Sequence, residues 1–390
     1  MKALLPLFLA VASLVCAAGD TALSRLKTKL PPGYKIPVVD LSTETGRQVV
    51  VDREKGQYLG HPSTLLLEDG HTILVVYPKG HGKGAIVYKR STDGGKTWSE
   101  RLPTPASWAT SLETPTLHRV VDAAGKKRII MFSGLYPIRM AVTEDDGLNW
   151  SELKPIGNYG GIVAMGSVVA LKQPGHYMAL FHDDGRFIIG GDGGKPAGKA
   201  WRFFVYQVRS MDGGLTWSAP SAVAHRWDAD LCEPGAVRSP DGKQIAVLLR
   251  ENSRSYNSFV ITSNDEGLTW SEPAEVSAAL TGDRHVAKYA PDGRLFISFR
   301  DTTHVSPTKG DWVAWVGHYE DLLHQGEGQY RIRLMHNHVT KFADCAYPGV
   351  ELLPDGTFVA TTYGKWVEDE LNYVVSVRLK LEETDAKAGK

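Results

Sequence analysis

The sequence predicts an all-β fold, a six-bladed β-propeller in one domain, and two repeated patterns carry this prediction. A pattern S/T-x-D-x-G-x-T/N-W occurs four times, beginning at Ser91, Thr143, Ser210 and Ser263. A second pattern, in which β-branched and apolar residues alternate around a tight turn such as D-G, covers residues 61–77, 114–132, 166–182, 233–250, 284–300 and 347–363. Two further strand-like runs follow each hairpin, so each unit is predicted to be a four-stranded antiparallel sheet. Six such sheets in radial repetition make a propeller.

The fourfold pattern is interpreted as the tip of an outer hairpin. The carboxylate of Asp93, or of its counterpart in another copy, can accept backbone N–H groups of the turn. Glycine supplies a positive φ, and the tryptophan packs the tip onto its own sheet. These contacts stabilise a turn and cleave nothing, so the pattern is predicted to be architectural.

Composition and charge exclude some classes of partner. The 390 residues include 44 Lys and Arg and 44 Asp and Glu, so no net charge favours nucleic acid or an anionic membrane surface. A charged ligand must then be bound by a local cluster. No helix-period segment or Gly/Ser linker interrupts the repeats, so residues 19–390 are predicted to form a single domain.

The N-terminal residues have the layout of a secretory signal peptide. Lys2 precedes an apolar run over residues 3–15 and then the small residues 16–19, so residues 1–18 are predicted to be removed on export and the protein to be secreted or periplasmic. The run is too short to span a bilayer, and the large residues ahead of Cys16 do not suit lipid attachment. Export leaves Cys232 and Cys345, which either pair or are two small buried hydrophobic residues.

Counting along the hairpins predicts a polar cluster at one mouth of the central channel. In four units, the residue eight positions before the turn is His61, Glu233, Arg284 or Tyr347. The second strands end in a further polar set, namely His182 with Asp183 and Asp184, Arg250, Arg300 with Asp301, and Tyr363. Glu113 and Arg139 are also expected to face the channel. Arginines, acids and tyrosines at one mouth predict a site for a small anion, best a carboxylate held by guanidinium groups. The run "HDDG" at His182 could be taken for a metal site, but no second His/Asp cluster stands at ligand spacing. Neither a metal ion nor a cofactor is therefore predicted.

These residues resemble the sialidase (neuraminidase) superfamily, whose Asp-box repeats and six-bladed propeller correspond to nearly the whole mature chain. The segment "DCAYPGVELLPDG" is similar to the one that carries the family's tyrosine nucleophile. The segment "CEPGAVRSPDGKQIAVLLRENSR" is similar to the one that carries its glutamate and a carboxylate-binding arginine. The resemblance implies an exo-α-sialidase that releases terminal sialic acid or a related ulosonic acid. Tyr347 would be the nucleophile, Glu233 its base, and Arg250 with Arg284 or Arg300 would bind the substrate carboxylate.

A tyrosine nucleophile suits such a substrate. The anomeric carbon of a sialoside already bears a carboxylate, which repels a carboxylate nucleophile. A neutral phenol that is activated by Glu233 avoids this repulsion, and its covalent intermediate makes the mechanism a retaining one.

The first unit departs from the family's pattern. The family normally has an arginine just before the proline of this unit, where this sequence has Gly60-His61. Its next loop normally offers an aspartate as general acid, and "YPKGHGKGAIVYKR" has none. His61 is therefore expected to bind the carboxylate together with Arg284, and the acid is left open between His81, Asp183 and Asp301.

Two other functions fit these departures. A propeller lyase or hydrolase of uronate-containing glycans would use His61 and either Tyr347 or Tyr363 as acid and base. A non-catalytic glycan-binding propeller would not require Glu233 and Tyr347 in matching positions. The sequence predicts no particular oligomeric state.

Overall fold

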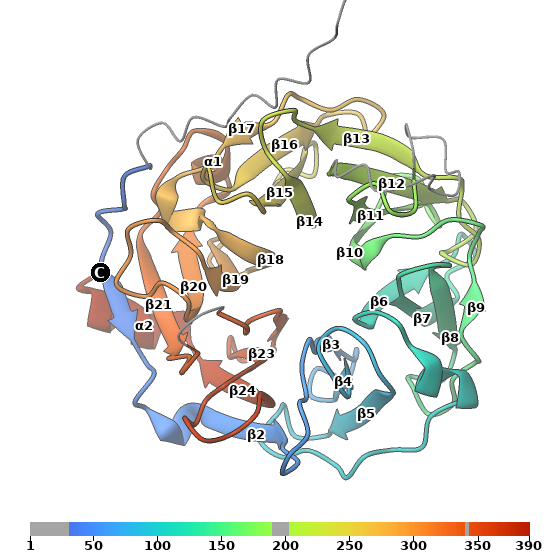
Figure 1. Cartoon of the computed structure of the whole chain (residues 1–390), viewed down its shortest axis with the longest axis horizontal. Helices are drawn as coiled ribbons and strands as arrows, with labels where there is room; N and C mark the ends of the chain where they lie inside the picture. The colour runs from blue at the N-terminus through green and yellow to red at the C-terminus, as the bar shows by residue number, and fades with distance from the viewer. Residues whose placement is uncertain (1–30, 189–202, 340–342) are drawn as a thin grey trace, which may run out of the picture.

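The hairpins of the sequence form the inner strands of six sheets, here called blades 1 to 6, which surround a central axis (Figure 1). The structure is a computed structural model, and it describes residues 31–188, 203–339 and 343–390. The predicted signal peptide, residues 1–18, lies outside the described residues. The sheets confirm the predicted all-β, six-bladed architecture.

The strands follow the chain from blade to blade. Blade 1 contains β3 (Ser63–Leu66), β4 (Ile73–Pro78) and β5 (Ile86–Ser91), and blade 2 contains β6 (Thr116–Val121), β7 (Lys127–Ser133), β8 (Arg139–Thr143) and β9 (Lys154–Pro155). Blade 3 contains β10 (Ile162–Ala170), β11 (Tyr177–Asp183), β12 (Phe204–Ser210) and β13 (Ser221–His225), and blade 4 contains β14 (Leu231–Arg238), β15 (Ile245–Glu251), β16 (Phe259–Ser263) and β17 (Ala274–Glu275). Blade 5 contains β18 (Gly282–Tyr289), β19 (Leu295–Asp301), β20 (Trp312–Gly317), β21 (Tyr330–Met335) and β1 (Val38–Asp40), and blade 6 contains β22 (Gly349–Leu352), β23 (Phe358–Gly364), β24 (Tyr373–Leu379) and β2 (Gln48–Asp52).

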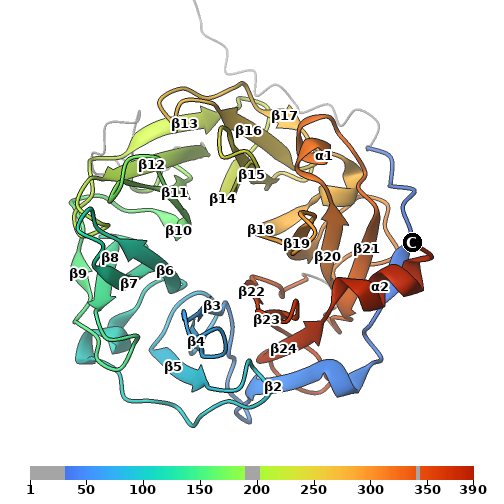
Figure 2. The same cartoon turned by 180° about the vertical axis from the view of Figure 1, so that it is seen from behind.

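The first strands of the blades lie nearest the axis (Figures 1 and 2). These strands, β3, β6, β10, β14, β18 and β22, contact one another in that order, and β22 returns to β3. Residues at the start of these strands therefore meet around one axis, although they are far apart in the sequence.

The prediction of four antiparallel strands in every blade is wrong for blades 1 and 5. Blade 1 has three strands within the described residues. The chain beyond its tip makes only short contacts with β5, such as Ser99 N–H to Arg90 O, and Pro103 and Pro105 then supply no amide donors for a ladder. Blade 5 gains a fifth strand, because β1 pairs in parallel with β21.

The ring is closed by the N-terminal part of the chain. Strand β2 pairs antiparallel with β24, so the outer strand of blade 6 comes from the opposite end of the described sequence. Figure 2 shows blue β2 beside red β24.

Helices are few, and the hairpin patterns did not predict them. They are the α-helices α1 (Tyr319–Leu323) and α2 (Leu381–Ala388) and the 3₁₀ helices η1 (Thr45–Arg47), η2 (Ala106–Thr110) and η3 (Ala278–Leu280). Helix α2 has Gly389 after it in the left-handed conformation that commonly ends a helix. Within the described ranges, no helix has the length and apolar character that a membrane crossing requires.

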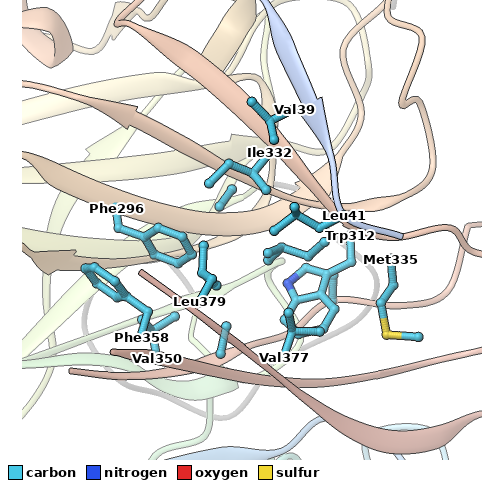
Figure 3. Packing of buried hydrophobic residues seen from close by; sticks show 14 of the residues in the cluster. Val39, Leu41, Phe296, Trp312, Ile332, Met335, Val350, Phe358, Val377 and Leu379 are labelled. Carbon is cyan, nitrogen blue, oxygen red and sulfur yellow. The ribbon is translucent and has the colours of Figure 1, made fainter. Parts of the chain in front are cut away.

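Apolar side chains fill the space between neighbouring blades. Figure 3 shows the cluster between blades 5 and 6, where the rings of Phe296 and Phe358 stack with centroids 4.5 Å apart. Trp312 and Val377 lie together in the same cluster, and Val39 of β1 packs over its edge. This packing holds the inner strands of adjacent blades at fixed positions around the axis.

The fourfold tips are built as predicted. In the first tip, Asp93 Oδ1 accepts the backbone N–H groups of Lys96 and Thr97 at 3.0 and 2.9 Å, and Thr97 Oγ1 donates to Asp93 Oδ2 at 2.6 Å. Gly94 and Gly95 both have positive φ. The tips contribute to the sheets and take no part in the site described next.

Candidate active site

Five inner strands have a residue in the left-handed backbone conformation close to their start, and none of these residues is glycine. They are His61 (φ 56°), Val163 (49°), Glu233 (51°), Arg284 (57°) and Ala346 (58°). The pairing register also shifts at this point in β10, β14 and β18, as in a β-bulge. Such backbone costs about 1–3 kcal/mol per residue and persists where the surrounding structure requires it. In blade 6 the strained residue is Ala346, so Tyr347 lies one position beyond the register counted from the sequence.

Tyr347 and Glu233 are in direct contact, although they come from blades 6 and 4. The phenol of Tyr347 donates a short hydrogen bond to Glu233 Oε1. Arg250 Nη1 contacts both groups, at 2.5 Å from Glu233 Oε1 and 3.0 Å from the phenol oxygen. Burial and the Glu233 charge raise the pKa of Tyr347 well above its usual value, so the phenol keeps its proton until a reaction removes it.

The arginines around this pair are held by one aspartate. Asp283 is fully buried and accepts from Arg254 at 2.6 and 2.8 Å and from Arg300 Nε at 2.9 Å, while Arg250 Nε lies 3.1 Å away. Although burial opposes it, the charges of Arg250, Arg300 and Arg254 hold the pKa of Asp283 well below its usual value. Arg300 Nη1 also donates to the backbone oxygen of Ala343 at 2.7 Å. The donors of Arg250 and Arg300 are thus largely engaged within the protein.

Arg284 differs from these arginines. It is buried, and in the described part of the chain its Nη1 atom has no hydrogen-bond partner. Burial lowers its pKa, and the charge of Glu233 acts on it in the opposite direction. A buried guanidinium group with an open donor is costly unless a ligand or water satisfies it.

His61 belongs to a hydrogen-bonded cluster beside Tyr347. Its Nε2 lies 2.9 Å from the Tyr363 hydroxyl, its Nδ1 accepts the Gly82 N–H at 3.2 Å, and its ring stands edge-on to Tyr347 with centroids 4.9 Å apart. Burial lowers the pKa of His61 to about 3, so its ring is neutral. Tyr363 then donates to Asp344 Oδ1 at 2.8 Å.

His81 completes this cluster at the rim. Its Nδ1 lies 3.2 Å from Asp344 Oδ2, which also accepts from Tyr58 at 2.8 Å, and 68% of its side chain is exposed. The hydrogen bond with Asp344 raises the pKa of His81. His61, His81 and Asp344 each bring a donor atom to within 4.8 Å of one another, a spacing that a metal ion could bridge. Because both Asp344 oxygens already accept phenol protons, the hydrogen bonds explain the cluster without an ion.

A pocket of about 440 Å³ opens in front of the Tyr347–Glu233 pair. Its lining includes seven of the residues expected at the site: Tyr347, Glu233, Arg250, His61, His81, His182 and Glu113. His182 accepts the Glu233 N–H at Nδ1, at 3.3 Å, and burial lowers its pKa. Lys83, Asp184, Arg186 and Asn252 also line the pocket. A hollow of this size, with phenol, carboxyl and imidazole groups on its walls, suits one polar sugar ring.

Other expected site residues lie elsewhere. Asp183 is buried beneath its own loop, where Oδ2 accepts the N–H groups of residues 185, 187 and 188. Asp301 forms a fully buried ion pair with Arg331 at 3.2 Å and borders a neighbouring cavity, together with Arg300. Arg139 donates to the backbone oxygen of Thr110 at 2.7 Å and does not line the pocket. The structure does not bring Asp183, Asp301 or Arg139 to the Tyr347–Glu233 pair.

Some residues of the site were missed from the sequence. Asp283, Asp344 and Tyr58 contact residues that were expected there, and Arg254 contacts Asp283. Asp283 stands one residue before Arg284 and Asp344 three before Tyr347, so proximity to the predicted positions was the only available signal. Cys232 and Cys345 are both free and buried, and Cys232 lines the pocket.

Comparisons with known proteins agree with this architecture. Residues 138–304 match the model of the BNR repeat-like domain, and residues 89–100 match that of the BNR/Asp-box repeat. Among the curated proteins, none matches the sequence significantly.

Three solved structures illustrate the likeness. A protein of unknown function from Dyadobacter fermentans is 16% identical with a TM-score of 0.66, and the match covers 86% of this chain and 98% of that one. An intramolecular trans-sialidase from leech is 15% identical with a TM-score of 0.58, covering 85% and 69%. An intramolecular trans-sialidase from Ruminococcus gnavus is 13% identical with a TM-score of 0.55, covering 84% and 95%. At these identities the likeness establishes the fold and leaves the activity open. The repeats, the six blades and these likenesses together show a six-bladed propeller with BNR/Asp-box repeats that shares its fold with these trans-sialidases.

Proposed function

We propose that the chain is an exported glycosidase that releases a terminal acidic sugar, sialic acid or a related ulosonic acid, from glycoconjugates. The contact between the Tyr347 phenol and Glu233, with Arg250 against both, supports this proposal most strongly. In the proposed roles, Tyr347 is a protonated nucleophile and Glu233 its base, and both line a pocket of about 440 Å³.

The first chemical step uses this pair. As the phenol oxygen attacks the anomeric carbon, the phenol proton passes to Glu233 and the bond to the leaving oxygen breaks. A general acid gives that oxygen a proton, and water later releases the sugar from Tyr347. Arg250 stabilises negative charge on the phenol oxygen, because its guanidinium lies 3.0 Å away.

The substrate's acidic group needs a cation that is not already engaged. Arg300 donates to Asp283, and the Arg250 guanidinium donates to other protein groups through Nη1 and Nη2. Within the described ranges, Nη1 of the buried Arg284 has no hydrogen-bond partner. We therefore assign the leading role in attracting the carboxylate to Arg284, with Arg250 and Arg300 adding positive potential.

The test is the intact mass of the protein after incubation with a 2,3-difluoro sialic acid. We expect a covalent adduct that maps to Tyr347 and is absent in Tyr347→Phe, because phenylalanine has no oxygen to bind the sugar. Tyr58→Phe is the control, since Tyr58 lies in the His81–Asp344 cluster and not against Glu233. An unmodified wild-type protein that also fails to cleave aryl sialosides would reject the proposal.

A second candidate is a lyase that acts on uronate-containing glycans. The neutral His61 favours it, because this ring contacts Tyr363 at 2.9 Å and stands against Tyr347. Arg300 also favours it, because an arginine that already binds Asp283 is less free to bind the carboxylate of a sialoside. Such an enzyme would form an unsaturated sugar. A rise in ultraviolet absorbance on incubation with uronate polymers, without release of sialic acid, would select this function.

A further inference from the structure

We propose that Glu113 is the general acid of this site, which protonates the leaving oxygen and afterwards takes a proton from the attacking water. This inference rests on the function proposed above and supplies the group that the first unit of the sequence lacks.

Glu113 stands on the same pocket wall as the reactive pair. It precedes β6 in blade 2, is 8% exposed, and lines the pocket together with Tyr347 and Glu233. The wall is continuous, because the His61 ring contacts Tyr347 and its Nδ1 accepts the Gly82 N–H. A methyl group on Gly82 would lie 3.3 Å from Glu113 Oε1. Glu113 and Tyr347 thus line one continuous wall of the pocket, whose volume of about 440 Å³ has room for a sugar ring.

The carboxyl group of Glu113 is built to give up and recover a proton. Oε1 accepts the Thr114 N–H at 3.0 Å, and Oε2 accepts the Val163 N–H at 3.1 Å. No ion pair joins it to a lysine, arginine or histidine of the described ranges. Burial raises the pKa of Glu113, so the carboxyl group stays protonated to a higher pH. The two backbone amides stabilise the carboxylate after the proton has left.

The surroundings hold this side chain in one place. Gly134 leaves it space, since a methyl group there would lie 2.9 Å from Glu113 Cγ. Val163, whose amide faces Oε2, is one of the five residues with strained backbone at the strand starts. Strain of this kind commonly marks a functional position, and here it directs an amide at the carboxyl group.

Other protonatable groups at or beside the pocket are less suited. Asp344 has a pKa of about 2 because, although burial opposes it, His81 and Tyr58 donate to it, so it carries no proton to give. Asp184 is paired with Arg186 at 2.8 Å. His81 is the main competitor, but its ring is mostly in solvent at the rim.

The proton balance of the reaction is complete with Glu113 in this role. In the first step its proton goes to the glycosidic oxygen, which leaves as an alcohol with the electron pair of the broken C–O bond. The phenol oxygen of Tyr347 forms the new bond, and its proton goes to Glu233. In the second step water attacks the anomeric carbon and gives a proton to the Glu113 carboxylate. The bond to Tyr347 breaks, and its oxygen recovers the proton from Glu233.

The experiment compares two substrates that differ only in the leaving group, 4-nitrophenyl and methyl α-sialosides. Nitrophenolate can leave without receiving a proton, whereas the methoxy group must be protonated and leaves as methanol. We expect Glu113→Gln to lower kcat/KM for the methyl sialoside by about 10²- to 10⁴-fold and for the nitrophenyl sialoside by much less. Glu113→Asp, which keeps a carboxyl group but withdraws it, should show the same selectivity in weaker form.

Two further variants make the result decisive. Glu351 is a buried glutamate outside the pocket, and it accepts a hydrogen bond from Thr64 at 2.9 Å. Glu351→Gln should leave kcat/KM unchanged for both substrates. Equal losses on both substrates in Glu113→Gln, or leaving-group selectivity in His81→Gln instead, would overturn the inference while the glycosidase proposal stands. Failure of the wild type to cleave either sialoside would overturn both.

Discussion

Asp283 lies behind the arginines of the site and neutralises part of their charge. Its carboxylate contacts Arg250, Arg254 and Arg300, which come from blades 4 and 5. The arginines are thereby oriented, and Arg250 is held against the Tyr347 phenol. A buried ion cluster of this kind adds little net stability, but it becomes very unfavourable when one partner is removed.

We expect Asp283→Asn to lower the free energy of unfolding by about 3–5 kcal/mol, because buried guanidinium groups lose their counter-charge. Urea unfolding followed by tryptophan fluorescence measures this change. Asp241→Asn is the control: its side chain is 57% exposed and lies 3.4 Å from exposed Lys243, so its effect should be much smaller. Equal stability of the two variants would contradict this role of Asp283.

The repeated tip is a turn that stabilises itself through one aspartate. In each copy a Ser or Thr hydroxyl donates to the aspartate, as Ser91 does to Asp93 at 2.8 Å, and the same aspartate accepts amides of the turn. Although burial opposes it, bonds from Thr97, Ser91 and Lys96 lower the pKa of Asp93 to about 2. The aspartate thus stabilises its own turn, and a neighbouring blade adds a further contact, since Arg378 of blade 6 donates to the Gly94 oxygen.

For this tip we expect Asp93→Ala to lower the free energy of unfolding by about 1–2 kcal/mol without changing activity, because the lost hydrogen bonds lie far from the pocket. The aspartate's contribution is present above about pH 4, the unfolded pKa, and is lost as the pH falls towards 2, the folded pKa. Thermal melting between pH 6 and pH 2 should therefore show a smaller acid decline in Asp93→Ala than in the wild type. Glu100→Ala, an exposed change beside the tip, serves as control, and a parallel decline in all three proteins would refute the assignment.

The ring as a whole depends on a strand from the start of the described chain. Strand β2 completes blade 6 beside β24, and Val51 of this strand packs with Leu59, Tyr77 and Val374 of blades 1 and 6. Tyr347 and Tyr363 belong to the same cluster, so closure of the ring also supports the site. The pairing of β2 with β24 shifts register between Val50 and Asp52, and at this point Val51 is buried whereas Val50 is exposed.

Closure can be tested with this pair of neighbours. Val51 is 1% exposed, and Val51→Ala should lower the free energy of unfolding by about 2 kcal/mol through lost burial and a small cavity. Val50 is 51% exposed, and Val50→Ala should change it by about 0.5 kcal/mol or less. Differential scanning calorimetry compares the two, and similar values would show that β2 contributes only backbone pairing to the ring.

The fold and the centre of the site were predictable because both depend on local patterns. Alternation around tight turns located the six hairpins, and the resemblance in the segments around Glu233 and Tyr347 pointed to a pair whose contact the structure then shows. The count of strands failed in blades 1 and 5, since proline and a parallel strand from the N-terminal region decide it.

The polar partners of the site depend on contacts between blades. Asp283 gathers arginines that come from two blades, and Asp344 joins groups from blades 1 and 6. Asp183 and Asp301 instead satisfy their own loops and Arg331. Position in the sequence places a polar residue near the channel mouth. Whether that residue faces the pocket or forms a structural contact depends on which buried polar and charged groups lie next to it. Those neighbours are determined only by how the blades pack.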